Sequence, residues 1–515
     1  MVTSKLINRT LFFGDNLDIL RDRIPDESFD LIYLDPPFNS NRSYNVIFKE
    51  GMQDSPAQIQ AFDDSWHWTE EAKRTFDSLV TGVDLAVSDL MLAFEKILGH
   101  NDILAYLSMM TIRLLELHRV LKPTGSVYLH CDPTASHYLK IVMDEVFGKR
   151  NFRNEIIWLY KGRELAHKRY SRKHDTIFFY TKSDKYSFYW KDIAEPLEET
   201  SRKALARYKD EKGYFILRYK KGGGFAPLEK EGADTYRQYL PQGVPPRDWY
   251  YADYARKSEQ LGYPTQKPEA LLERIIKASS PEGGWVLDPF CGCGTTPAVA
   301  ERLKRNWIGI DISTLAVNLV KHRLISQFNL GLKDLNVDGL PRDMNGAKEL
   351  FHRDPFEYEY WALDKVNAVP AKSKRKGKMR GADKGVDGVI VFYKDKSGDD
   401  WLYGRAVVQV KGGAVQRKDI AALRGDIERE KADSGVFISL EKPTKPMFEE
   451  AVEAGHFTTP LTGKKEFPKI QLLTVDELLE GKPPVLPAGL IKNYFKEAKA
   501  SEYESEKDNQ KGLDI

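Results

Sequence analysis

The stretch Asp288-Pro289-Phe290-Cys291-Gly292-Cys293-Gly294-Thr295-Thr296 follows an apolar run at residues 285–287 and opens a helix-like segment. Its glycines let the backbone turn sharply and approach a ligand closely. The free N–H groups at the start of the following helix suit a carboxylate. Asp311 ends the next apolar run, about twenty residues on, where a carboxylate commonly binds ribose hydroxyls. The stretch therefore predicts a strand–turn–helix–strand unit that binds an adenosine-containing cofactor.

The same pattern continues toward both ends of the chain. Short apolar runs end in polar residues, and helix-like segments separate them; the runs are 31–34, 127–129 and 307–310, and the segments are 106–121, 135–147 and 268–279. Apolar runs of this length are typical of strands that are buried on both faces. The alternation predicts an open, mainly parallel α/β sheet that binds its ligands at the carboxyl ends of the strands.

Composition limits the class of protein. The chain has 515 residues, of which 41% are hydrophobic and 30% charged, and this size indicates about three globular domains. No apolar run reaches the ~18 residues that span a bilayer, and the N-terminus lacks a signal-peptide pattern. We therefore expect a cytoplasmic protein without a membrane partner. Three cysteines, Cys131, Cys291 and Cys293, are too few for a disulfide framework, and their spacing does not favour a zinc site.

A second motif, Asp35-Pro36-Pro37-Phe38, follows the apolar run at residues 31–34. The exocyclic amine of a nucleobase is a poor nucleophile, because its lone pair is delocalised into the ring. If the Asp35 carboxylate and the rigidly aimed Pro36 carbonyl accept its two N–H bonds, the nitrogen moves toward a tetrahedral shape and exposes the lone pair. Phe38 would stack on the base, which must be flipped out of a duplex to reach such a site.

Further motifs accompany these two. They are Gly14-Asp15-Asn16, Leu121-Lys122-Pro123-Thr124-Gly125-Ser126-Val127, Asp144-Glu145-Val146-Phe147-Gly148 followed by Asn151-Phe152, and Thr265-Gln266-Lys267-Pro268-Glu269. Together and in this order they resemble the β-class amino-methyltransferases of DNA, including the modification subunits of type III restriction systems, over roughly residues 6–325. The resemblance implies a permuted Rossmann-like fold that uses S-adenosylmethionine, with the catalytic motif first and the donor-binding motif last.

The resemblance also implies roles for single residues. The flipped base would be held by Asp35, Pro36, Pro37 and Phe38. The donor would be bound by Asp15, Thr265, Lys267, Asp288, Phe290, Gly292, Gly294, Thr295 and Asp311. Among these, Asp15 would meet the adenine amine, Asp311 the ribose, and Thr265 and Lys267 the methionine end. The partner would be double-stranded DNA, and a homodimer is compatible with the sequence.

The target base is less sharply defined. Asp at the first position of the catalytic motif favours N6 of adenine, whereas Ser there is typical of cytosine enzymes. Phe38 stands where many adenine enzymes have Tyr, so N4-cytosine stays open. Protein glutamine methyltransferases begin a similar motif with Asn and place the donor motif first, and this sequence has neither feature.

Another constellation lies further along the chain. Gly381-Ala382-Asp383-Lys384-Gly385-Val386-Asp387-Gly388 precedes one apolar run, and Arg405-Ala406-Val407-Val408-Gln409-Val410-Lys411 forms the next. Hydrolysis of a phosphodiester needs a divalent ion and an activated water. Asp387 and the Gln409 side chain are candidate Mg²⁺ ligands, and Lys411, on the same strand face, could orient the water. The basic run at 372–380 would meet phosphates beside it.

Residues 351–480 resemble the PD-(D/E)xK nuclease superfamily, in particular the branch of methylated-DNA restriction enzymes. An upstream helix adds Glu357 or Glu359 as a further candidate, and the sequence does not distinguish them. Gln409 departs from the Asp or Glu usual at its position, and a neutral ligand weakens metal binding. Two hypotheses follow: an active nuclease, and an inactive fold that is kept to bind DNA. We favour the active nuclease.

The expected organisation has four parts. A methyltransferase domain at 1–330 carries a helical insertion at 41–101 and a target-recognition region at 185–261; a linker at 331–350, a nuclease-like α/β domain at 351–481 and a partly disordered tail at 482–515 follow. We expect a site-specific DNA methyltransferase of a restriction–modification system with a C-terminal endonuclease. The alternatives are a solitary N6-adenine or N4-cytosine methyltransferase whose C-terminal domain only binds DNA, and a DNA-binding protein with degenerate sites.

Overall fold

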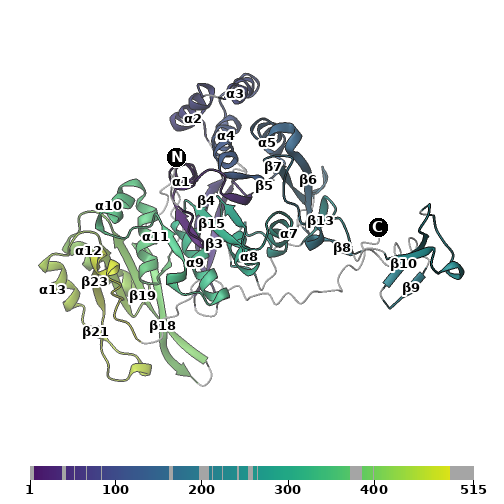
Figure 1. Ribbon diagram of the computed structural model, residues 1–515. Helices are drawn as coiled ribbons and strands as arrows, with labels where there is room; N and C mark the ends of the chain where they lie inside the picture. Colours follow the sequence, from purple (N-terminus) through teal and green to yellow (C-terminus); the bar gives the residue numbers. More distant parts are fainter. Residues whose placement is uncertain are drawn as a thin grey trace.

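The computed structural model describes most of the chain (Figure 1). The described residues are 5–37, 42–50, 53–64, 67–82, 84–161, 166–196, 208–211, 213–222, 224–239, 243–252, 259–261, 263, 265–371, 385–397 and 400–487. In 42–50 and 53–64 the description covers the backbone alone. Phe38 and the basic run at 372–380 lie outside the described residues.

A nine-stranded sheet forms the centre of the front part, in the order β13-β6-β7-β5-β2-β14-β15-β1-β16. Its strands are β1 (Thr10–Phe13), β2 (Phe29–Leu34), β5 (Leu121–Cys131), β6 (Phe152–Leu159), β7 (His174–Thr181), β13 (Trp249–Tyr251), β14 (Trp285–Asp288), β15 (Asn306–Asp311) and β16 (Asn336–Asp338). The strands pair in parallel except for β7, which runs antiparallel to β5 and β6. The expected open α/β sheet is confirmed.

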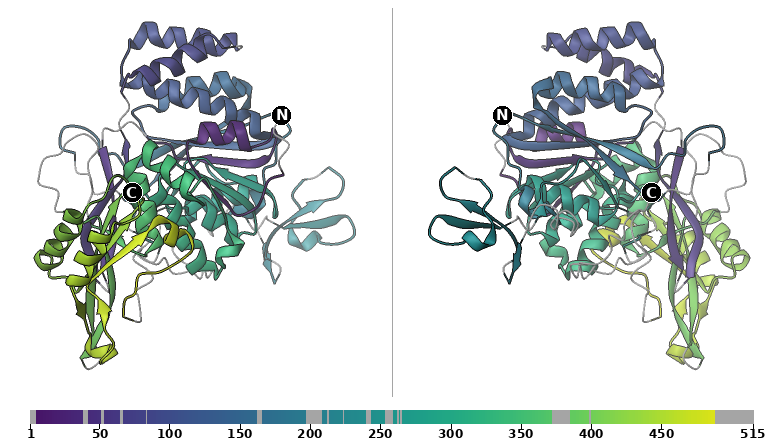
Figure 2. Two further views of the ribbon diagram at one scale, coloured as in Figure 1. Left: turned by 90° about the vertical axis from the view of Figure 1, so that its left-hand side faces the viewer. Right: turned by 90° about the vertical axis from the view of Figure 1, so that its right-hand side faces the viewer.

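Helices cover both faces of this sheet, because its strand residues are apolar on both sides. One face packs Ile32 and Leu34 against helices α1, α3, α4 and α5, and the other packs Leu31 and Tyr33 against α7, α8 and α9 (Figure 2). The helices are α1 (Asn16–Arg23), α3 (Leu85–Leu98), α4 (Asp102–Val120), α5 (Ser136–Met143), α7 (Glu269–Ser279), α8 (Thr295–Arg302) and α9 (Thr314–Phe328). Burial on both faces explains why the strands read as continuous apolar runs.

Four neighbouring parallel strands deliver four carboxylates to one edge of the sheet. Asp35 follows β2, Asp288 ends β14, Asp311 ends β15 and Asp15 follows β1. Strand β14 pairs with β2 through Leu287 and Ile32, so the catalytic and donor motifs lie side by side although they are far apart in sequence. Parallel pairing therefore places both motifs at the carboxyl edge, where such sheets bind ligands.

The insertion expected to be helical at 41–101 is only partly so. Its first half is an antiparallel hairpin of β3 (Arg42–Glu50) and β4 (Gln53–Asp64), and its second half is α2 (Glu70–Val80) and α3. The helical prediction was wrong for residues 42–50 and 53–64, because they have little apolar periodicity of either kind and pairing across the hairpin decides their conformation.

Residues 185–261, expected to recognise the target, form a small β-rich region. Strands β9 (Tyr208–Asp210), β10 (Gly213–Tyr219) and β11 (Thr235–Tyr239) make a three-stranded sheet that projects away from the main sheet in both figures. Strand β8 (Glu195–Pro196) pairs with β12 (Gly243–Val244), and β13 returns to the main sheet beside β6. The region is thus anchored to the main sheet through β13, and its β9–β11 sheet lies away from the main sheet.

The segment expected as a linker at 331–350 is structured. Strand β16 pairs in parallel with β1 through Thr10 and Asn336, and α10 (Met344–Arg353) begins before the segment ends. The linker prediction was wrong because β16 has only three residues, too few for a periodic signal, and its pairing with β1 supplies its order.

The rear part contains a five-stranded sheet in the order β17-β18-β19-β20-β23. Its strands are β17 (Val369–Pro370), β18 (Gly388–Ser397), β19 (Asp400–Lys411), β20 (Ser434–Ser439) and β23 (Ile470–Thr474), with helices α11 (Pro355–Lys365), α12 (Arg417–Arg429), α13 (Lys445–Glu453) and α14 (Val475–Leu479). A short hairpin pairs β21 (His456–Phe457) with β22 (Phe467–Pro468). Within the described residues, no helix is long and apolar enough to cross a membrane.

Candidate active site

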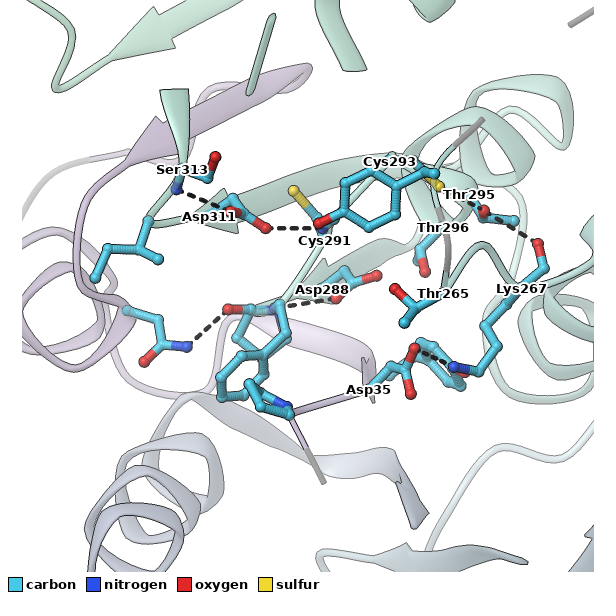
Figure 3. A pocket seen from close by; sticks show the side chains of 18 of the residues that line it. Asp35, Thr265, Lys267, Asp288, Cys291, Cys293, Thr295, Thr296, Asp311 and Ser313 are labelled. Carbon is cyan, nitrogen blue, oxygen red and sulfur yellow. Dashed lines mark hydrogen bonds and ion pairs between the residues drawn. The ribbon is translucent and has the colours of Figure 1, made fainter. Parts of the chain in front are cut away.

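A cavity of about 190 Å³ opens at the carboxyl edge of the main sheet. It brings together ten of the residues singled out in the sequence, which are Asp15, Asp35, Pro37, Thr265, Lys267, Asp288, Phe290, Gly292, Thr295 and Asp311. Figure 3 shows Asp288 lying between the pair of Asp35 and Lys267 and the carboxylate of Asp311. One continuous cavity therefore joins the two motifs.

The carboxylate of Asp35 lines the cavity, and only one of its two oxygens has a hydrogen-bond partner among the described residues. Its Oδ2 accepts from Lys267 Nζ at 2.5 Å. Its Oδ1 is buried and has no hydrogen-bond partner among the described residues, and His130 Nδ1 lies 3.9 Å away. A buried acceptor without a donor is costly, so this oxygen suits the N–H of a substrate amine.

A buried polar chain supports Asp35 from behind. Nε2 of His130 lies 3.2 Å from Asp175 Oδ2, and because a carboxylate only accepts, Nε2 carries the hydrogen. Nδ1 then accepts from the Tyr33 hydroxyl at 3.1 Å. Burial raises the pKa of Tyr33 well above its ordinary value, so the hydroxyl stays protonated. Burial also opposes ionisation of Asp175, but the hydrogen bond from His130 holds its pKa below the usual value.

Two carboxylates line the cavity beside the glycine turn, and Asp288 is the more deeply buried of the two. Burial raises the pKa of Asp288 to about 7 and that of Asp311 to about 6. The backbone N–H of Gly292 donates to Asp311 Oδ2 at 2.8 Å and that of Ser313 donates to Oδ1 at 2.9 Å. These two bonds fix the Asp311 carboxylate at the end of β15, where ribose hydroxyls could reach its remaining lone pairs.

The two glycines of the donor motif act differently. Gly292 lines the cavity with φ of +48°, and a Cβ there would lie 3.4 Å from the Tyr263 ring. Gly294 is not among the lining residues; its φ is +74°, and a Cβ would lie 2.7 Å from Val320 on α9. The role expected for Gly294 as a donor contact is therefore corrected: it permits the close packing of α8 against α9.

Asp15 lines the cavity, and its carboxylate already accepts hydrogen bonds from other residues. Both of its oxygens accept from Arg113 Nη2 at 2.8 Å, and Oδ1 also accepts from the N–H of Leu17 at the start of α1. Arg113 also donates to Asn16, which in turn donates to the carbonyl of Pro289. Sequence reasoning missed Arg113, although an arginine within the apolar helix α4 was a detectable signal.

Lys267 lines the cavity and contacts the catalytic motif. It was assigned to the methionine end of the donor, and the structure pairs its ammonium with Asp35. Its backbone carbonyl accepts from Thr295 Oγ1 at 3.2 Å, which ties the segment to the start of α8. Lys267 thus connects the catalytic motif to the donor motif, and Thr265 lines the cavity two residues before it.

The residues fit a cationic adenosine-containing donor. Four carboxylates line the cavity, and Lys267 and Arg113 are each engaged with one of them. Asp288 and Asp311 remain to balance a positive charge such as a sulfonium. The positive φ of Gly292 keeps the turn free of a side chain beside the donor.

The candidate nuclease site of the rear part has few groups that could bind a metal ion. Asp387 Oδ2 accepts from the N–H of Val410 at 2.7 Å, and Gln409 Nε2 donates to the carbonyl of Gly385 at 2.5 Å. Lys411 is exposed at the end of β19. No group of three or more His, Cys, Asp or Glu side chains suited to a metal occurs among the described residues.

One of the two candidate upstream glutamates, Glu357, lies away from the rear site. Glu357 Oε2 accepts from the N–H of Thr314 at 2.7 Å, so its carboxylate faces the front part of the molecule and the vicinity of Asp311. As a candidate metal ligand of the rear site, Glu357 is excluded by this geometry.

Comparison with known families divides the chain into the same front and rear parts. A family model described as DNA methylase (N6/N4) matches residues 29–322, which is more than half of the chain. A second, described as NACHT-associated inactive restriction endonuclease 1, matches residues 373–480. The rear match covers a restriction-endonuclease-like family whose description does not support the cleavage placed ahead in the sequence analysis.

Two curated methyltransferases are similar to this chain over about half of its length or more. Type II methyltransferase M.HpaI of Haemophilus parainfluenzae is 32% identical over 249 residues, which cover 48% of this chain and 66% of that relative. DNA adenine methyltransferase YhdJ of Escherichia coli (strain K12) is 29% identical over 322 residues, covering 61% of this chain and 82% of that relative. The chain thus spans 66% of the length of the first relative and more of the second.

Solved structures align weakly. The PvuII DNA methyltransferase (cytosine-N4-specific) gives a TM-score of 0.39 at 15% identity, covering 65% of this chain and 96% of that one. The M1.HpyAVI–SAM complex gives 0.30 at 16% identity, covering 61% and 99%. The assignment instead follows from the family match together with the cavity that joins the two motifs: the chain belongs to the N6/N4 DNA methylase family, on a Rossmann-like α/β fold.

Proposed function

We propose that this chain transfers a methyl group from S-adenosylmethionine to the exocyclic nitrogen of a flipped base in duplex DNA, with N6 of adenine as the target. The observation that carries the proposal is the unsatisfied Oδ1 of Asp35, a carboxylate that lines the same cavity as Asp288 and Asp311. It supports the proposal because an acceptor suited to the amine shares one cavity with carboxylates suited to the donor.

The donor supplies an activated methyl group on a positively charged sulfur, which leaves as a neutral thioether. Asp35 accepts an N–H of the target amine and thereby localises the nitrogen lone pair for attack on the methyl carbon. Lys267 holds the other carboxylate oxygen, and the buried His130 and Tyr33 keep neighbouring solvent out. After the C–N bond forms, the nitrogen loses a proton, for which Asp35 Oδ1 is the adjacent acceptor.

Adenine is preferred to cytosine on two grounds. Asp35 occupies the first position of the catalytic motif, where the resemblance favours adenine. In addition, a relative 29% identical to this chain is named a DNA adenine methyltransferase. N4-cytosine is the alternative outcome of the same chemistry.

For the rear part we propose DNA binding without cleavage. Of its two candidate Mg²⁺ ligands, Gln409 is a neutral amide and Asp387 is a carboxylate that already accepts a backbone N–H. Neutral ligands weaken binding of a hard cation, which prefers carboxylate oxygen. The matching family is itself described as inactive.

Two assays on the full chain test these proposals. Unmethylated DNA incubated with the protein and donor, then digested to nucleosides, should contain N6-methyladenine by mass spectrometry. Detection of N4-methylcytosine instead would show that cytosine is the target base. Absence of both methylated nucleosides would refute the front-domain proposal. Supercoiled plasmid incubated with Mg²⁺ should stay intact, and nicking that Asp387→Ala abolishes would refute the rear-domain proposal.

A further inference from the structure

A helix from beyond the methylase match reaches back to the donor cavity. The match ends at residue 322, and α11 begins more than thirty residues later. Glu357 of α11 accepts from the backbone N–H of Thr314, the first residue of α9, at 2.7 Å. The three residues before Thr314 are Asp311, Ile312 and Ser313, and all three line the cavity. Glu357 therefore caps helix α9, which begins directly after the cavity-lining residues 311–313.

A second contact holds the same two helices together further along. Asp364 pairs with Lys321 at 2.9 Å and with His322 at 3.4 Å, both on α9. Although burial opposes ionisation, these two partners hold the pKa of Asp364 below its usual value. Tyr358 and Trp361, between the two polar contacts, are buried in the core that also contains Val317 and Val320 of α9. The helices α9 and α11 thus form one unit.

The opposite side of α11 belongs to the rear part. It contacts β17 and β19 of the rear sheet and the helix α14 (Figure 1). Strand β19 carries Gln409 and Lys411 at its end. A single helix therefore lies between the candidate DNA-binding sheet and the wall of the donor cavity.

We propose that Glu357 is a positioning residue for the methyl donor, so that the rear domain completes the donor site of the methyltransferase. It acts through Thr314: the cap fixes the start of α9 and, with it, the turn that carries Asp311 and Ser313. This inference rests on the proposed function, because it requires that the donor bind in this cavity.

The charge of Glu357 gives the inference a signature that depends on pH. Burial raises its pKa to about 7, with added repulsion from Asp354 at the start of α11 and from Asp311 on β15. A carboxylate accepts a stronger hydrogen bond than its protonated form. The cap therefore weakens as pH falls through about 7, and donor affinity should fall with it.

The test compares Glu357→Ala and Glu357→Gln with wild type and with Glu349→Gln, which alters an exposed glutamate on α10. Binding of S-adenosylmethionine to the full chain is measured by calorimetry at pH 8, and methyl transfer to DNA gives KM for the donor and kcat. Glu357→Ala should raise both Kd and KM about tenfold with kcat within about twofold. Glu357→Gln, whose amide oxygen still accepts the Thr314 N–H, should stay within about threefold, as should Glu349→Gln.

Donor affinity between pH 8 and 6.5 provides the second readout, which holds even where Glu357→Ala fails to fold. Wild type and Glu349→Gln should lose affinity over this range, whereas Glu357→Gln should lose clearly less, because Asp288 and Asp311 still titrate in it. Wild-type-like Kd in Glu357→Ala, or an unchanged pH profile in Glu357→Gln, would overturn the inference. Absence of donor binding by wild type would instead refute the proposed function.

Discussion

Asp35 is held by Lys267 on one oxygen, while its other oxygen is buried and has no hydrogen-bond partner among the described residues. Asp35→Asn keeps the shape of the side chain but removes the charge that localises the amine lone pair. We expect kcat for methyl transfer to fall by about 10²–10³, the usual loss for one preorganised electrostatic group, with donor Kd within about threefold. Asp184→Asn, whose side chain is 84% exposed, is the control. Unchanged kcat in Asp35→Asn would exclude the proposed role.

The two turn glycines give a matched pair for stability. Both require a left-handed φ, which costs an alanine about 1–2 kcal/mol. In Gly294→Ala the new methyl group would also meet Val320 at 2.7 Å, which adds about 1–3 kcal/mol of overpacking. Thermal unfolding without donor should therefore show a larger decrease in Tm for Gly294→Ala than for Gly292→Ala. The reverse order would show that the α8–α9 contact is not as close as described.

Two buried carboxylates predict a pH dependence of stability. The pKa values of Asp288, about 7, and Asp311, about 6, are raised by burial above the unfolded value of 3.8. Each group therefore stabilises the fold fully below about pH 4, and that contribution is lost as pH rises through 6 to 7. Without donor, these groups should make Tm higher at pH 5.5 than at pH 8, and Asp288→Asn should reduce the difference. A difference unaffected by Asp288→Asn would contradict this assignment.

At the scale of residues, the sequence predicted those groups that a strand end places directly. Asp35, Asp288 and Asp311 each end or follow an apolar run, and parallel strands bring such ends together. Arg113, His130 and Asp175 gain their roles from partners about 45 to 98 residues away, as in the 3.2 Å contact of His130 with Asp175. No local pattern specifies such a pairing. The pairing of Lys267 with Asp35 was not predicted for the same reason.

At the scale of elements, long apolar segments were predicted correctly and short or polar ones were not. Strands β2, β14 and β15 and helices α4 and α7 lie within a few residues of their expected positions. Hairpin β3–β4 and strand β16 were not predicted, because pairing with a neighbouring strand determines their conformation. Val46 pairs with Ile59 in the hairpin, and Val337 of β16 pairs with Leu11. Pairing across a sheet leaves no periodic signal in a strand of three residues.

The sheet of β9, β10 and β11 predicts a separable function. Its three strands pair with one another and project from the main sheet, while the cavity is formed by other elements. Replacing residues 208–239 with a short Gly/Ser linker should leave donor Kd within about threefold and abolish methylation of specific DNA sites. The check is calorimetry together with sequencing of the methylated positions. Retention of the wild-type recognition sequence by this variant would place target recognition elsewhere.

At the scale of the whole molecule, front and rear share one hydrophobic core. Buried residues of the main sheet and α9, such as Leu11 and Val317, belong to the same cluster as Trp361 of α11 and Val408 of β19. A chain ending at residue 330 would expose the α9 face that α11 covers. It should unfold at a lower temperature than the full chain and bind the donor more weakly. An equal Tm for the two chains would show that the front part is independent of the rear.

The central claim is that Asp35 and the donor cavity form one DNA-methylating site, and transfer of labelled methyl groups to DNA tests it most directly. Full-length protein, unmethylated plasmid and S-adenosylmethionine labelled in the methyl group would be incubated without added metal, alongside Asp35→Asn and Asp184→Asn. The account predicts labelled N6-methyladenine with wild type and Asp184→Asn, and almost none with Asp35→Asn. Labelling that is equal in all three proteins, or absent although the donor binds, would contradict it.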